Sequence, residues 1–223
     1  MCSLFILWDV SVAKLCLIIL AVFFLSFYSV AQTQSIQFQT SFQNENQIKL
    51  DDTLVLGDSL IVISKFKYYV GFESNNRIKY TLIDFGSIMK TSLIIDSQMT
   101  NQSFYIGVDS TTNVSGALAG DLDPTKGMYW AWQSGYINFK MEGTYIYKTE
   151  TTEFNYHLGG YLTPYSNAQK VELSLGNDKA KQVINLDLYP FFSQANISQS
   201  VMRPCAESVQ LMQIISNSFS LVD

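Results

Sequence analysis

The sequence has 223 residues, of which 48% are hydrophobic and 15% are charged, and its formal net charge is −5. Acidic and basic residues are interspersed, so the composition gives no reason to expect a nucleic acid or an anionic membrane surface as a partner. The chain has one histidine, which argues against the hydrolytic triads that are built around this residue.

The first thirty residues have the pattern of a secretory leader. Lys14 precedes an apolar run over residues 15–25, and the small residue Ala31 offers a cleavage site. We therefore expect a signal peptide over residues 1–31, a mature domain over residues 32–223, and export to the periplasm or outer envelope. The alternative is a retained membrane anchor, because the apolar stretch approaches the length that spans a bilayer. We adopt cleavage and expect no lasting membrane insertion.

The mature chain is dominated by strand patterns. Residues 36–43 alternate between apolar and polar side chains, as a strand with one buried face does. Residues 60–72 and 78–85 are rich in β-branched and aromatic residues and are separated by a polar turn, which predicts a hairpin. Six more strands are predicted, over residues 92–96, 103–108, 136–148, 152–158, 168–175 and 183–189.

Two segments depart from the strand pattern. The polar run from Asp109 to Gly127 is longer than most loops of a compact domain, which is typical of functional or disordered loops. Residues 206–215 have apolar side chains at helical spacing after Pro204 and form the one predicted helix. We expect an all-β fold, an antiparallel β-sandwich with one long functional loop and a short C-terminal helix, because two packed sheets bury many half-apolar strands.

The mature sequence offers little for catalysis. It contains no G-x-S-x-G, P-loop, H-E-x-x-H or C-x-x-C motif, and its carboxylates are expected on the solvated surface. Cys205 is the one cysteine after the leader, so no intramolecular disulfide can form. We expect Cys205 to be a small buried hydrophobe, and the alternative is pairing between molecules. The sequence therefore favours a binding protein over an enzyme.

One stretch carries a specific pattern. Residues 128–136 read Met-Tyr-Trp-Ala-Trp-Gln-Ser-Gly-Tyr. Gly107-Val108-Asp109 and Asp123-Pro124 precede this stretch, and His157-Leu158-Gly159 and Val201-Met202-x-Pro204 follow it. Together these elements resemble the MbnP-like family of exported copper-binding proteins, which is related to proteins of the MopE and CorA type. The resemblance spans nearly the whole mature chain, and the double-tryptophan run is its most specific part.

The resemblance implies a β-rich envelope domain that binds copper through histidines and a tryptophan oxidised to kynurenine. It also implies a di-haem cytochrome c peroxidase-like enzyme as the partner that makes this modification. His157 matches the family's His-Leu-Gly element, and Trp130 and Trp132 match its two tryptophans, so these three residues are the predicted metal site. The second histidine of the family is missing.

Other donors are therefore needed for a strong site, since Cu(I) also accepts soft sulfur ligands. The sulfur atoms in the mature chain that we consider belong to Met128, Met141, Met202 and Cys205.

The residues themselves leave alternatives open. Strand alternation places His157 on the polar face of its strand, as a surface ligand or as a solvated residue before the Gly159-Gly160 turn. Trp130 and Trp132 are two residues apart, so in an extended segment they point the same way, and the alternative to a metal role is that both pack as a lid over the core.

Four loop residues provide oxygen atoms that would suit calcium, namely Asp109, Asn113, Asp121 and Asp123. The alternative is a solvated acidic loop, because Asp and Asn also form turns. At the level of the whole protein, the leading hypothesis is an exported metal-binding accessory protein, with copper as the metal. The competing hypothesis is a structural or interaction domain of the cell envelope that keeps the fold without a metal site.

Overall fold

The computed structural model describes residues 33–43, 47–74, 77–87, 91–96, 103–133, 135–173, 175, 180–197 and 199–222. The predicted signal peptide lies outside these residues. The first half of the described chain contains β1 (Thr33–Ser41), β2 (Thr53–Leu56), β3 (Ser59–Ser74), β4 (Arg77–Asp84), β5 (Ser92–Asp96), β6 (Ser103–Ile106), α2 (Ser110–Val114) and the 3-10 turns η3 (Gly120–Leu122) and η4 (Pro124–Lys126). The second half contains β7 (Tyr129–Trp130), β8 (Gly135–Tyr147), β9 (Glu150–Gly159), β10 (Gln169–Glu172), β11 (Lys181–Asp187), α3 (Tyr189–Gln194), α4 (Ala206–Ser216) and β12 (Phe219–Val222).

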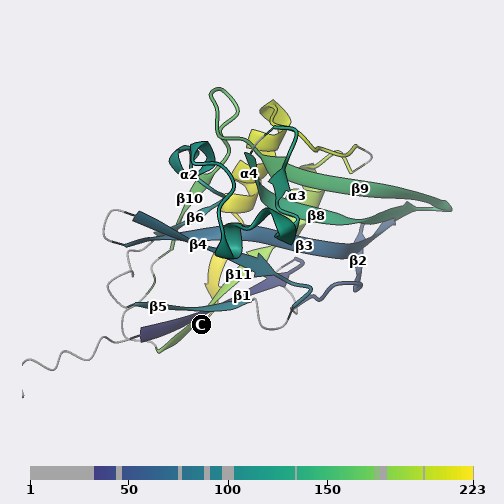
Figure 1. The fold of residues 1–223 in the computed structure, drawn as a ribbon. Coiled ribbons are helices and arrows are strands. Elements are labelled where there is room, and N and C mark those ends of the chain that lie inside the picture. The colour runs from purple at the N-terminus through teal and green to yellow at the C-terminus, as the bar shows by residue number, and fades with distance from the viewer. Residues whose placement is uncertain are drawn as a thin grey trace, which may run out of the picture. The chain divides into compact units, whose positions relative to one another are not determined.

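The described strands form two sheets that pack as a sandwich (Figure 1). The small sheet has the strand order β12-β11-β1-β5, and the large sheet has the order β10-β6-β3-β8-β7, with β2 and β4 also paired to β3 and β9 paired to β8. Most pairs are antiparallel, as predicted, and the β3–β4 hairpin is confirmed. The pair β1–β11 is parallel, with Ser35 opposite Lys181 and Ser41 opposite Asp187. The predicted β-sandwich is therefore confirmed, with one parallel pair added.

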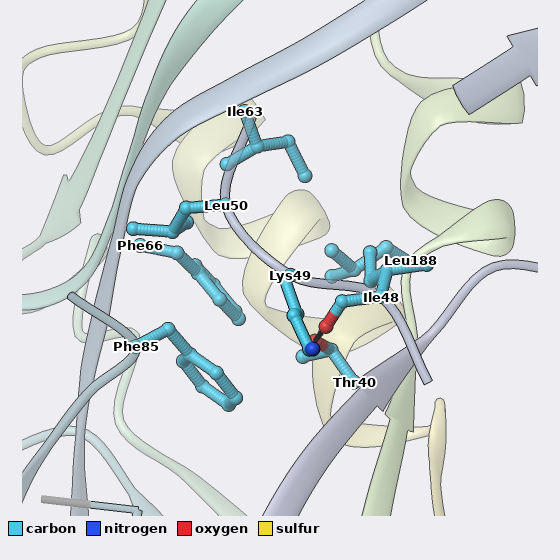
Figure 2. Close-up of a pocket in the computed structure, with 8 residues that line it drawn as sticks. All are labelled: Thr40, Ile48, Lys49, Leu50, Ile63, Phe66, Phe85 and Leu188. Atoms are coloured by element: carbon cyan, nitrogen blue, oxygen red, sulfur yellow. Dashed lines mark hydrogen bonds between the residues drawn. The ribbon is translucent and has the colours of Figure 1, made fainter. Parts of the chain in front are cut away.

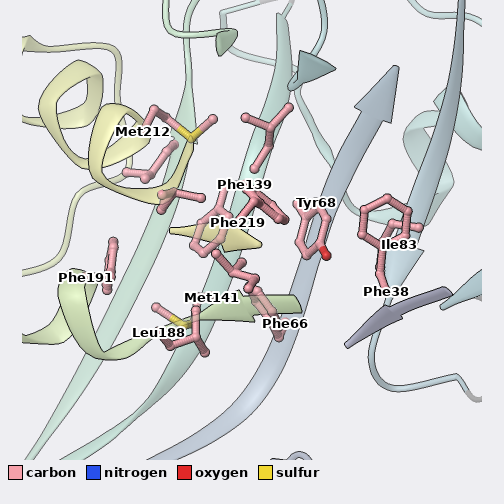
Figure 3. Close-up of a cluster of buried hydrophobic side chains, with 14 of the residues drawn as sticks. Phe38, Phe66, Tyr68, Ile83, Phe139, Met141, Leu188, Phe191, Met212 and Phe219 are labelled. Atoms are coloured by element: carbon pink, nitrogen blue, oxygen red, sulfur yellow. The ribbon is translucent and has the colours of Figure 1, made fainter. Parts of the chain in front are cut away.

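Aromatic side chains fill the space between the sheets. Phe38 of β1 meets Tyr68 of β3 edge to face, with ring centroids 6.1 Å apart. Phe219 of β12 meets Phe104 of β6 in the same way at 5.2 Å. This geometry is favourable for aromatic pairs beyond the area that they bury. Figure 3 shows Phe38, Tyr68 and Phe219 together in this core.

Helices α3 and α4 contribute to the same core. Phe191 of α3 and Met212 of α4 are fully buried in the cluster that the sheets form, and both are labelled in Figure 3. The ring of Phe191 lies 6.0 Å from that of Phe139, measured between centroids. Helix α4 confirms the predicted C-terminal helix. Helix α3 replaces the end of the predicted strand 183–189, since β11 stops at Asp187. Pro190 explains this change, because proline is tolerated in the first turn of a helix but cannot donate to a strand ladder.

A small cavity lies at the margin of the core (Figure 2). It is lined by Thr40, Ile48, Lys49, Leu50, Ile63, Phe66, Phe85 and Leu188. Its volume of about 10 Å³ is close to the space that one water molecule occupies. The cavity therefore has no room for an organic ligand.

The polar run 109–127 is an ordered layer over the outer face of the large sheet. It contains α2 and the two 3-10 turns, and Leu122 and Met128 pack there against Tyr69, Leu82 and other apolar residues of the sheet. The hydroxyl of Tyr136 fastens this layer, since it accepts from the amide of residue 118 at 2.9 Å and lies 3.1 Å from the carbonyl oxygen of Leu122. The large sheet thus has a hydrophobic cluster on each face. None of the helices in the described part of the chain could span a bilayer.

Candidate metal centre

His157 lies on the outer face of β9. Phe154, Tyr156 and Leu158 are fully buried in the core between the sheets, so the residues between them point to the opposite face. This confirms the strand alternation that the sequence predicts. In the sheet register, His157 lies opposite Lys140 of β8.

The imidazole is held by a carboxylate. Nε2 of His157 lies 2.9 Å from Oε1 of Glu142 on the neighbouring strand β8. Glu142 also pairs with Lys65 of β3 at 2.7 Å and with Lys140 at 3.2 Å. Only 15% of the His157 side chain is exposed. His157 is therefore a largely covered, hydrogen-bonded residue, which differs from the solvated histidine that the sequence left open.

Burial and charge set the protonation of this pair. Burial lowers the pKa of His157, and the hydrogen bond to Glu142 opposes that effect without reversing it. Burial would raise the pKa of Glu142, but hydrogen bonds from Lys65 and His157 and the positive charge of Lys140 lower it to about 2. At neutral pH the site thus holds an ionised carboxylate beside a neutral imidazole.

This arrangement suits a metal ligand. An ionised carboxylate can only accept a hydrogen bond, so Nε2 of the neutral ring carries the proton and Nδ1 keeps a lone pair. Among the described residues, Nδ1 of His157 has no hydrogen-bond partner. Metal-binding histidines commonly donate their other ring N–H to a carboxylate, which fixes the ring and raises its basicity. His157 and Glu142 therefore fit one histidine ligand with its supporting group.

Trp130 lies on the same face as His157. It is the last residue of β7 and is only 6% exposed. A Cβ atom added to Gly159 would lie 2.7 Å from the indole ring of Trp130, so the ring covers Gly159 directly. His157 and Gly159 are two residues apart on β9 and point to the same face. The structure thus places Trp130 over a residue that lies two positions from His157 on the same face of β9.

Trp132 has a different environment from Trp130. The chain leaves the strand after Trp130, and the Trp132 side chain is 67% exposed. The two indole rings still touch, with centroids 5.5 Å apart and planes at 42°. Packing as a lid therefore describes Trp130, whereas Trp132 faces solvent.

The four sulfur atoms lie in separate places. Met128 is buried in the outer cluster, and Met141 is buried in the core on the opposite face of the large sheet. Cys205 is half-buried and caps α4, where its Sγ accepts from the amide of Ser208 at 3.4 Å. Met202 is 48% exposed and follows a residue that bridges to β9.

The oxygen-rich loop residues have structural partners. Asp109 caps α2 through Thr112 and also accepts a hydrogen bond from Tyr80. Asn113 is buried, and its side chain accepts from the amide of residue 136 at 2.9 Å.

The two remaining carboxylates of the loop are also engaged. Asp121 pairs with Lys126 at 2.6 Å, and Asp123 caps η4. Within the described ranges, no group of three or more His, Cys, Asp or Glu side chains is arranged to hold a metal ion. The structure therefore gathers no carboxylate cage for calcium there.

A family model supplies the deciding comparison. The model named MbnP matches residues 25–210 of the sequence. The chain belongs to the MbnP family. Among solved structures, MbnP from Methylosinus trichosporium matches with a TM-score of 0.55 and 15% identity, over 80% of this chain and 86% of that chain. At this identity the match shows a shared fold. No protein with a curated description matches the sequence.

Sequence reasoning missed the partners of His157 in this MbnP-family chain. Glu142 reads as one surface acid among several, and nothing in a single sequence gives the register that pairs β8 with β9. The alternation Lys140-x-Glu142 was the available signal, because it places both side chains on one face of a strand. None of the three predicted site residues lines the small core cavity. None of them lines the open groove near Lys49 and Lys181 either.

Proposed function

We propose that this protein binds copper without catalysing a reaction, and that Nδ1 of His157 is a metal ligand. The observation that carries the proposal is the 2.9 Å contact between Nε2 of His157 and Glu142, since it orients a neutral imidazole and leaves the second nitrogen for a metal. Imidazole nitrogen suits copper well. Membership of the MbnP family supports copper as the metal, although the family's second histidine is absent.

An indole-derived group would add a donor. Trp130 is the better candidate for a ligand, because its ring covers Gly159 on the face that His157 shares. Trp132 is the better candidate for contact with an oxidising partner, because it is exposed and its ring touches that of Trp130. We propose a di-haem cytochrome c peroxidase-like enzyme as this partner, with hydrogen peroxide as the oxidant and with electrons leaving Trp130 through Trp132. In overall balance, Trp130 and two molecules of hydrogen peroxide give kynurenine at position 130, formic acid and one water.

The site is tested by copper binding to the purified mature chain. His157→Ala is expected to weaken Cu(I) binding by about 100-fold or more, because it removes the anchoring nitrogen. Asn155→Ala is the matched control, since Asn155 precedes His157 by two residues on the same face of β9. Equal copper retention in the native chain and in His157→Ala would reject the site.

Tryptophan oxidation has its own readout. After coexpression with an active di-haem peroxidase, peptide mass mapping is expected to find kynurenine at position 130 and an unmodified residue at position 132. Modification of neither tryptophan would count against the partner and against the kynurenine donor. The comparison of copper binding by the native chain and by His157→Ala would still decide whether His157 is a ligand.

A metal-free envelope scaffold is the second candidate. The sequence has one histidine, and its Nε2 is occupied by Glu142, which favours a purely structural pair. A native chain that retains neither Cu(I) nor Cu(II) would support this function. For either function we propose export to the periplasm or outer envelope, which cell fractionation and N-terminal sequencing of the mature protein would test.

A further inference from the structure

The segment before α4, residues 200–204, runs alongside β9. The amide of Val201 donates to the carbonyl oxygen of Asn155 at 2.9 Å, and the amide of His157 donates to the carbonyl oxygen of Val201 at 2.8 Å. These two bonds form a parallel bridge between Val201 and Tyr156. The amide of Asn155 also donates to the hydroxyl of Ser200 at 3.0 Å. This end of the segment is therefore fixed in register with the strand that carries His157.

A second anchor holds the other end of the segment. A Cβ atom added to Gly160 would lie 3.0 Å from Cβ of Pro204, so the proline packs closely against the residue that follows β9. Val201 lies beside Tyr156, and Pro204 lies beside Gly160. The chain between them therefore advances in the same direction as β9, and Met202 lies level with His157.

The bridge also defines which way Met202 points. Partners in a bridge direct their side chains to the same face of a sheet, and Val201 and Tyr156 are both buried in the inner core. The next residue, Met202, is 48% exposed, so its side chain does not enter the inner core as that of Val201 does. Met202 is therefore on the outer side of the sheet, the side that His157 faces.

We propose that the thioether of Met202 is a second copper donor beside His157 and makes this a site for Cu(I). This inference rests on the proposed function. A neutral imidazole and a thioether form a soft pair without charge, which suits Cu(I) better than Zn(II) or Cu(II). The sulfur of Met202 would also take the place of the second histidine that the family has and this chain lacks.

Met202→Leu removes the sulfur and nearly conserves the volume of the side chain. Met202→Leu is expected to weaken Cu(I) binding by about tenfold or more, measured by competition with a chromophoric Cu(I) chelator, and to leave Zn(II) binding unchanged. Met141→Leu is the matched control, because it removes a thioether from the inner face of the same sheet, and such a swap conserves volume.

Two spectroscopic readouts identify the ligand directly. X-ray absorption of the Cu(I)-loaded native chain is expected to contain a sulfur shell that disappears in Met202→Leu and persists in Met141→Leu. In a chain labelled with methyl-¹³C methionine, titration with Ag(I), a redox-inert substitute for Cu(I), is expected to shift the Met202 methyl signal and not that of Met141.

The outcomes distinguish this inference from the function on which it rests. If the native chain binds Cu(I) through His157, but Met202→Leu binds as tightly and no sulfur shell is seen, Met202 is not a ligand and the proposed function stands. If the native chain binds no copper, the proposed function fails and this inference fails with it. A sulfur shell that survives Met202→Leu would overturn the assignment to Met202.

Discussion

At the scale of single residues, the face of His157 was predictable and its partner was not. Alternation along β9 follows from the apolar residues at positions 154, 156 and 158, so the outward direction of His157 can be read from the sequence. The contact with Glu142 depends on how β8 and β9 pair, and register is set by packing across strands that a single sequence does not display. The different exposures of Trp130 and Trp132 also depend on where β7 ends.

A substitution of Gly159 tests how closely Trp130 packs on β9. Because glycine has no side chain, the indole ring and the backbone oxygen of Tyr136 occupy the space beside it. They would lie 2.7 Å and 2.5 Å from an added Cβ atom. Gly159→Ala is expected to lower the free energy of unfolding by about 1 to 3 kcal/mol and to shift the emission of Trp130 to longer wavelength.

Gly86→Ala is the control for this substitution. An added Cβ at Gly86 meets a flexible carboxylate oxygen at 3.2 Å, so an effect below about 0.5 kcal/mol is expected. Urea denaturation with tryptophan fluorescence measures both variants. A Gly159→Ala protein as stable as the native chain would contradict the tight contact.

At the scale of elements, the strand pattern predicted most of the large sheet and missed the short pieces. The long strands β3, β8 and β9 contain many β-branched and aromatic residues, and their patterns are strong. β2 has four residues and β7 has two, which is too short for a periodic signal. The start of α3 was predicted as strand because Leu188 and Tyr189 extend an apolar run.

Strands β3, β8 and β9 place two lysines and one histidine around Glu142. The stability of the fold therefore depends on pH. The folded pKa of Glu142 is about 2, below its ordinary value of 4.5. Its contribution to stability is therefore present above pH 4.5 and is lost as the pH falls from 4.5 to about 2. The lowered pKa of His157 acts in the same direction, because the unfolded chain takes up a proton first as the pH falls below 6.5.

Glu142→Gln tests this dependence in the metal-free protein. It is expected to lower the free energy of unfolding by about 1 to 2 kcal/mol at pH 7 and to flatten the stability profile below pH 4.5. Glu150→Gln, at the exposed start of β9, is expected to leave the profile nearly unchanged. Denaturant titrations between pH 2 and pH 7 provide the measurement, and parallel profiles for native and Glu142→Gln chains would refute the assignment.

At the scale of the whole molecule, buried amides join elements that are far apart in the sequence. The side chain of Asn167 accepts from Asn138 of β8 at 2.6 Å and donates to the carbonyl oxygen of Gly159 at 2.9 Å. It also lies 3.5 Å from the hydroxyl of Ser208 in α4. The sequence predicted the sandwich itself, since many half-apolar strands must bury one face, but it did not predict this network, because Asn167 lies in a loop without a motif.

Asn167→Ala is expected to weaken the whole fold. It leaves a buried amide and a buried carbonyl without partners, which costs about 2 to 4 kcal/mol in total. Asn217→Ala, at the exposed end of α4, is the control and is expected to have a much smaller effect. Calorimetry would record the change as a lower melting temperature, and an unaltered Asn167→Ala transition would show that the network contributes little.

The parallel pair of β1 and β11 has a consequence for biosynthesis. Ile36 belongs to the first described strand, and its partner Gln182 is made only after most of the chain has been translated. At about 5 to 20 residues per second, roughly 7 to 30 seconds pass between the synthesis of Ile36 in β1 and that of Gln182 in β11. A nascent chain therefore cannot complete its small sheet until β11 has been made. A pore that translocates the chain in an unfolded state can engage it during that interval.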